Sequence, residues 1–147
     1  MPNLSIIFIR TGLIYFIFGF ILGAFLLFNK AYPFNLILWQ LLPLHYLILF
    51  FGWILQLVFG VAFWIMPRFG KSYGKTWLAW SCYLFLNTGL VTLISSYFLI
   101  FLNEEIKSLY ILATILIYLG ISCFVFFIWP RIRQVIAEIP PNNFAGE

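Results

Sequence analysis

Residues 44–70 read LHYLILFFGWILQLVFGVAFWIMPRFG and decide the class of fold. Between His45 and Arg68 no residue carries a full charge. A helix needs about 20 apolar residues to cross the hydrocarbon core of a bilayer, and this stretch is long enough. Within lipid, a helix satisfies its own backbone hydrogen bonds. The stretch therefore predicts a transmembrane helix, and it contains the single histidine of the chain, His45.

The composition of the whole chain agrees with a membrane protein. Of its 147 residues, 65% are hydrophobic and 8% are charged, whereas a soluble domain has about 25% charged residues. We expect one domain over residues 1–147, an all-α bundle of four transmembrane helices. The predicted helices cover about residues 6–28, 36–66, 77–102 and 108–129. Pro130 is expected to end the fourth helix, and residues 130–147 are expected to form a short cytoplasmic tail.

The distribution of Lys and Arg predicts the orientation of the bundle. One side carries Arg10, Arg68, Lys71, Lys75, Arg131 and Arg133, and the other carries only Lys30 and Lys107. Cytoplasmic flanks are enriched in Lys and Arg, so we expect both termini in the cytoplasm and His45 in the outer part of the second helix. The cations are scattered between apolar runs, so we expect no nucleic-acid partner.

Helical spacing places small and polar residues in line with His45. At 100° per residue, Gly52 and Gln56 point within about 20° of His45, and Gly60 lies near the same face. Glycines let membrane helices approach closely, and Gln56 is expected to hydrogen-bond to the third helix. The candidate partners there are Asn87, Thr88, Thr92 and Ser95. This stripe is therefore predicted to face protein rather than lipid.

Two interpretations of His45 follow from this stripe. In the first, His45 is a neutral, hydrogen-bonded residue near the outer surface, and the glycines serve only helix packing. In the second, His45 is an axial ligand of haem iron, because a porphyrin needs an imidazole nitrogen and small residues beside its face. The candidate cofactor-binding residues are His45, Gly52, Gln56 and Gly60. Cys82 and Cys123 lack the spacing of a metal site, so we expect them to be packing residues.

The same stretch resembles a known family. Residues 42–68, LPLHYLILFFGWILQLVFGVAFWIMPR, resemble the second transmembrane helix of haem-copper oxidase subunit I. They are also similar to short membrane proteins described as cytochrome c oxidase subunit I-like. The matching positions are His45, Gly52, Trp53, Gly60, Val61, Ala62, Trp64, Pro67 and Arg68. The resemblance implies that this helix runs inward from the outside and that His45 ligates a haem in the outer part of the bilayer.

The histidine count limits the activity that this resemblance implies. Oxygen reduction in the oxidase family uses several histidines for two haems and a copper ion, so a chain with one histidine is no oxygen reductase by itself. Met66 lies about 30 Å from His45 along the same helix, too far to share an iron. A second histidine ligand has to come from another copy across a two-fold axis, or else the iron is five-coordinate. Candidate partners for the haem propionates are Lys30, Trp39 and Gln40.

We therefore expect a b-type haem protein that serves electron transfer, haem handling or redox sensing beside a respiratory chain. Its expected surroundings are membrane lipid, a respiratory redox partner and further copies in a homodimer or higher homo-oligomer, in a prokaryotic inner membrane. The alternative is a haem-free structural or accessory subunit of a larger membrane complex. No catalytic acid, base or nucleophile is evident, since the four acidic residues lie in predicted loops and the tail.

Overall fold

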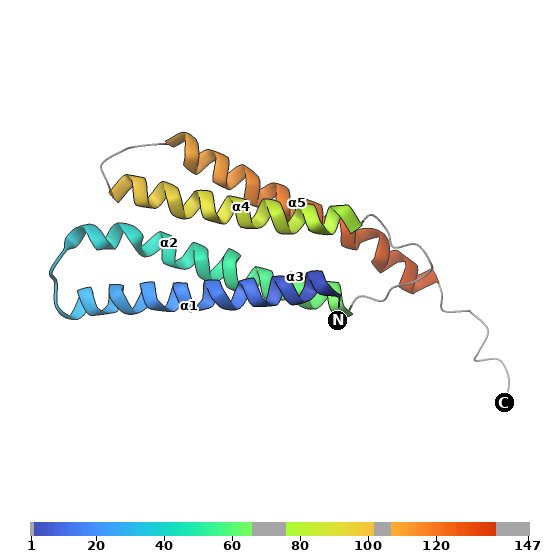
Figure 1. The fold of residues 1–147 in the computed structure, drawn as a ribbon, viewed down its shortest axis with the longest axis horizontal. Coiled ribbons are helices and arrows are strands. Elements are labelled where there is room, and N and C mark those ends of the chain that lie inside the picture. The colour runs from blue at the N-terminus through green and yellow to red at the C-terminus, as the bar shows by residue number, and fades with distance from the viewer. Residues whose placement is uncertain (1, 66–75, 102–106, 138–147) are drawn as a thin grey trace, which may run out of the picture.

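The computed structural model of the protein describes residues 2–65, 76–101 and 107–137, and the regular structure in these ranges is helical (Figure 1). The first membrane helix is α1 (Asn3–Ala31). The second consists of a 3-10 segment η1 (Leu36–Leu41), α2 (Leu42–Leu47), a π-helical segment η2 (Ile48–Ile54) and α3 (Leu55–Ile65). The remaining helices are α4 (Thr76–Phe101) and α5 (Lys107–Ala137).

Four helical spans in the described residues are long and apolar enough to cross a membrane. They cover Asn3–Ala31, Leu36–Ile65, Thr76–Leu99 and Lys107–Pro130. In the most apolar part of each span, at most 33% is buried inside the bundle, so most of the surface needs an apolar surrounding. These spans confirm the predicted helical class and indicate an integral membrane protein.

The helices form two hairpins that lie side by side (Figure 1). In the first hairpin α1 packs along η2 and α3, and in the second α4 packs along α5. The start of α1 lies at the same end of the bundle as α3 and the last turns of α5. We call this the N-terminal end, and we call the opposite end, where residues 32–35 connect α1 to η1, the turn end.

The fourth helix does not end at Pro130, as the sequence predicted. α5 continues through Pro130 to Ala137. Proline removes one backbone hydrogen bond and crowds the preceding turn, but the helical bonds on both sides of it can persist. The prediction was wrong because a single missing donor interrupts a helix without ending it. α1 is also longer than predicted at both ends.

The second membrane helix changes its winding along its length. It begins as the 3-10 segment η1, where the Asn35 side chain accepts a hydrogen bond from the N–H of Ile37 at 2.9 Å. Pro43 lies in the first turn of α2, where a missing N–H costs nothing. The segment FNLILWQLL before His45 therefore includes the first turns of this same helix. The wider π-helical winding of η2 then carries Gly52, and such insertions are frequent at functional sites.

A buried asparagine holds the turn of the first hairpin. Asn29 is 1% exposed, and its Nδ2 donates to the carbonyl oxygen of Asn35 at 2.9 Å. Its Oδ1 accepts from the N–H groups of Phe34 and Asn35 at 3.3 and 3.2 Å. One amide thus satisfies three backbone groups of the turn. It thereby fixes where the second helix starts relative to α1, and so where His45 lies.

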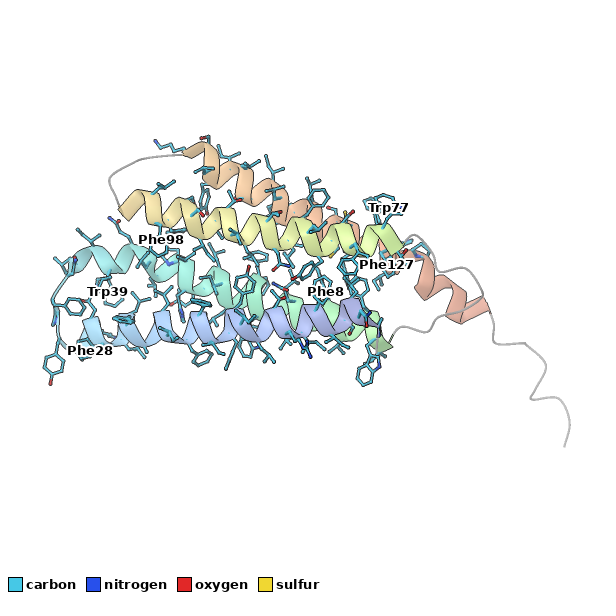
Figure 2. All side chains as sticks on the ribbon, in the orientation of Figure 1. Phe8, Phe28, Trp39, Trp77, Phe98 and Phe127 are labelled. Atoms are coloured by element: carbon cyan, nitrogen blue, oxygen red, sulfur yellow. The ribbon has the colours of Figure 1, made fainter. Side chains whose placement is uncertain are left out.

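Aromatic side chains join the two hairpins near the N-terminal end. Phe8 of α1 is fully buried and meets Tyr83 of α4 edge to face, with ring centroids 5.1 Å apart. Phe59 of α3 stacks on Phe124 of α5 at 3.7 Å. Phe8 lies between the hairpins in Figure 2, on the side of Phe127. Such aromatic pairs are worth about 0.5–1.5 kcal/mol each beyond the area they bury.

Tryptophans lie at both ends of the bundle, as in the aromatic belts of membrane proteins. Trp39 lies at the turn end and Trp77 at the N-terminal end (Figure 2), and both side chains are exposed. Indole rings combine an apolar body with one N–H donor, so they favour the headgroup level. Trp39 and Trp77 lie at opposite ends of the bundle, close to where the membrane helices begin.

Within the second hairpin the two backbones are almost in contact. A Cβ atom on Gly120 would lie 2.9 Å from the backbone nitrogen of Leu86, and one on Gly89 would lie 2.9 Å from that of Ile117. Backbone atoms cannot move aside as a flexible side chain can. α4 and α5 therefore depend on glycine at both contact points. Cys82 is fully buried in this core, and Cys123 is partly buried.

The contacts of the glycines predict a difference between two Gly→Ala variants. Gly120→Ala forces α4 and α5 apart and should lower the free energy of unfolding by about 1–3 kcal/mol. Gly12→Ala is the matched control, because its Cβ would meet nothing closer than the Trp53 carbonyl oxygen at 3.4 Å. Thermal unfolding in detergent measures both. Equal melting temperatures for the two variants would contradict the tight contact at Gly120.

Candidate functional site

His45 lies in α2, and its imidazole ring rests against α1. A Cβ atom on Gly23 would lie 2.6 Å from Cε1 of His45 and 3.3 Å from each ring nitrogen. Only glycine at this position leaves room for the ring. Nδ1 of His45 lies 2.9 Å from the carbonyl oxygen of Gly19, one turn earlier in α1. Gly19 and Gly23 thus form a backbone niche that holds the imidazole.

This hydrogen bond determines the tautomer of His45. A carbonyl oxygen can only accept, so Nδ1 carries the proton and donates it to Gly19. In a neutral imidazole Nε2 then keeps its lone pair. Among the described residues Nε2 has no hydrogen-bond partner, and it is not fully buried. Metal-ligating histidines have this arrangement, with one ring N–H on a carbonyl and the other nitrogen free.

Gly52 and Gly60 face protein, as predicted, and the protein they face is α1. A Cβ atom on Gly52 would lie 2.7 Å from Cγ of Tyr15. One on Gly60 would lie 3.0 Å from Cγ1 of Ile9, and the Ser5 hydroxyl donates a hydrogen bond to the Gly60 carbonyl oxygen. The space beside both glycines is therefore filled by side chains of α1.

Gln56 is fully buried, and it bonds to the third membrane helix as predicted. Its Nε2 donates to Oδ1 of Asn87 at 3.1 Å, and Nδ2 of Asn87 donates to the Tyr83 carbonyl oxygen at 2.9 Å. The other three candidate partners, Thr88, Thr92 and Ser95, donate instead to carbonyls of their own helix. Gln56 thus links the first hairpin to the second.

The groups that surround the imidazole were not found from the sequence. Gly19 and Gly23 carry the four-residue spacing of small residues that is typical of close helix packing, and this spacing is the signal that could have pointed to α1. A second missed contact joins the hydroxyls of Thr11 and Tyr83 at 2.9 Å. Both contacts connect helices, so neither follows from the periodicity of one helix.

Nε2 of His45 fits the role of a haem ligand. The rest of the predicted haem-binding face, Gly52, Gln56 and Gly60, does not offer free space for a porphyrin. His45 presents a free Nε2 beside an apolar surface. The haem contacts predicted for Gly52, Gln56 and Gly60 stay predictions, since these residues have partners on α1 and α4. The described residues contain no group of three or more metal-binding side chains, and Met66 lies outside them. A second histidine ligand, if one is used, has to come from another chain, because His45 is the single histidine in the sequence.

The candidate propionate partners are near the same end of the bundle as His45. Lys30 lies in the last turn of α1 and Trp39 in η1, and both side chains are exposed. Gln40 is also an exposed residue of η1. Lys30 is about 10 Å beyond Gly23 along α1, at 1.5 Å per residue. These donors lie closer to the turn end than the imidazole does.

None of the compared protein-family models matches the chain, and neither does any curated protein or solved structure. The resemblance to cytochrome c oxidase subunit I-like proteins stays a prediction from the sequence.

The niche around the imidazole predicts the effect of Gly23→Ala. The added methyl group displaces Cε1 of His45 and breaks the bond from Nδ1 to Gly19. Nitrogen-15 NMR of the side chain should show a single tautomer with protonated Nδ1 in the unchanged protein, and an exchanging imidazole in the variant. Gly12→Ala serves as the control. An identical imidazole spectrum in Gly23→Ala would contradict the niche.

Proposed function

We propose that the protein is a membrane-embedded haem protein in which Nε2 of His45 binds the iron. The observation that carries this proposal is the hydrogen bond from Nδ1 to the Gly19 carbonyl oxygen, because it leaves the lone pair of Nε2 free to bind a metal ion. A b-type haem supplies reversible one-electron chemistry. The resemblance of residues 42–68 to the oxidase helix supports the same assignment. Electron transfer, haem handling or redox sensing beside a respiratory chain is the role that this chemistry serves.

The residues of the chain hold and tune such a site in three ways. Gly23 leaves space for the ring, and the carbonyl oxygen of Gly19 fixes its orientation through the hydrogen bond. Lys30 and the polar groups of η1 are available to haem propionates near the membrane surface. The apolar side chains around α2 keep water away. No oxygen reduction is proposed for a chain with one histidine.

The proposed assembly is a homodimer or a higher homo-oligomer in a prokaryotic inner membrane. Two copies related by a two-fold axis supply two His45 ligands to one iron. Both termini are assigned to the cytoplasm from the sequence alone, because the sequence flanks on that side carry most of the Lys and Arg residues. The turn end, and His45 with it, then faces outward, where a respiratory redox partner is reached.

The absorption spectrum of the purified protein tests the haem assignment. After expression with sufficient haem, we expect a Soret band and sharper visible bands on reduction with dithionite. His45→Ala should lower the haem bound per chain at least about tenfold, because it removes the iron ligand. Tyr46→Phe, at a neighbouring exposed position, should leave the spectrum unchanged. If the protein without any substitution is colourless, the proposal is refuted.

Native mass spectrometry tests how the iron is coordinated. One haem per two chains, together with the spectrum of a six-coordinate low-spin iron, is expected from ligation by both copies of His45. One haem per single chain would refute the shared ligation but keep His45 as the ligand.

A haem-free accessory subunit of a larger membrane complex is the second candidate. It is favoured by the filling of the space beside Gly52 and Gly60, since helix packing alone then accounts for the glycines. Under this function, His45→Ala weakens only the contact between α1 and α2. Copurification with other membrane subunits and the absence of colour would distinguish it from the haem protein.

A further inference from the structure

One buried polar atom in the described part of the chain lacks a hydrogen-bond partner. It is Oε1 of Gln56, whose side chain is 0% exposed. The residue lies within the second membrane span, where neither lipid nor bulk water supplies a donor. Buried polar side-chain atoms in proteins are normally paired, either with protein or with an ordered water. The exception at Gln56 therefore requires a physical explanation.

The orientation of the Gln56 amide is determined by the Tyr83 carbonyl oxygen, to which it is connected by two successive hydrogen bonds through Asn87. The Tyr83 carbonyl oxygen can only accept, so Asn87 must turn Nδ2 toward it. Oδ1 of Asn87 then faces Gln56 and can only accept, so Gln56 must present Nε2. Rotating the Gln56 amide by 180° would place two oxygens against each other. The unpaired acceptor is thus a consequence of the network.

A surplus donor lies on residues next to the contacts of Gln56 in α1 and α4. The hydroxyls of Thr11 and Tyr83 share one hydrogen bond of 2.9 Å, which uses one of their two protons. Tyr83 lies one turn from Asn87, and the neighbour of Thr11, Gly12, is packed against Gln56. The polar layer between the hairpins therefore contains one unused acceptor and one unused hydroxyl proton.

We propose that a water molecule is bound inside the membrane at Oε1 of Gln56. It donates one proton to Oε1 and accepts the free proton of the Thr11 and Tyr83 hydroxyl pair. The site takes a small neutral donor, because the polar atoms around it are amide and hydroxyl groups without charge. The contact between the two hairpins then contains a water-bridged network that joins α1, α3 and α4. This site is independent of the proposed haem.

A structure of the full chain in lipid at about 2 Å resolution or better tests the site. We expect a density peak for water at about 2.7–3.2 Å from Oε1 of Gln56. Gln56→Met, which keeps the length of the side chain without its amide, should lose this peak. Thr92→Val is the matched control, because the Thr92 hydroxyl is bonded within its own helix, and it should keep the peak.

A second variant and a second measurement cover the case in which Gln56→Met does not fold. Thr11→Val removes one bridging hydroxyl and should lower the occupancy of the water at least severalfold, while the bond from Gln56 to Asn87 remains. In solid-state NMR, magnetisation should pass from water to Cδ of Gln56 in the unchanged protein. A dry Oε1, a direct bond from a protein hydroxyl to Oε1, or no transfer from water would overturn the proposal.

Discussion

The lack of hydrogen-bonding solvent in the bilayer is the constraint on which the rest of this structure depends. Each polar group in the spans has to find its partner within the bundle, because an unpaired one costs several kcal/mol in hydrocarbon. Hydroxyls along α4 and α5 return to carbonyls of their own helices. Asn29 satisfies the turn of the first hairpin, and the imidazole of His45 donates to Gly19. Among the buried side-chain atoms of the described residues, only Oε1 of Gln56 is left without a partner.

Glycine makes these polar contacts possible by bringing backbones together. Gly23 lets the imidazole of His45 reach the backbone of α1, where the carbonyl oxygen of Gly19 accepts its hydrogen bond. In the second hairpin, Gly89 and Gly120 instead bring two backbones into contact and leave no polar niche. The same residue type therefore has two consequences. The first hairpin contains an imidazole nitrogen without a hydrogen-bond partner in the described residues, and in the second hairpin the two helices are closely packed.

The two functions proposed for the protein differ in what they ask of His45. For a haem protein, the bond to Gly19 orients a ligand, and the free Nε2 is the reason for the niche. For an accessory subunit, the same bond only satisfies a polar group within lipid. Nε2 has no hydrogen-bond partner in the described residues, which an iron ligand requires and a structural histidine allows. The filled space beside Gly52 shows that a porphyrin contact on that face would need α1 to move.

The sequence by itself determined the helical spans, the protein-facing stripe of Gly52, Gln56 and Gly60, and the bond from Gln56 to the third helix. These follow from hydropathy and from the periodicity of one helix, which are local properties. It left four candidate partners for Gln56, and it ended the fourth helix at Pro130. Only the tertiary structure decided that Asn87 is the partner, that α5 passes Pro130, and that Gly19 and Gly23 hold His45. Such contacts depend on the rotation and register of one helix against another, which no single helix encodes.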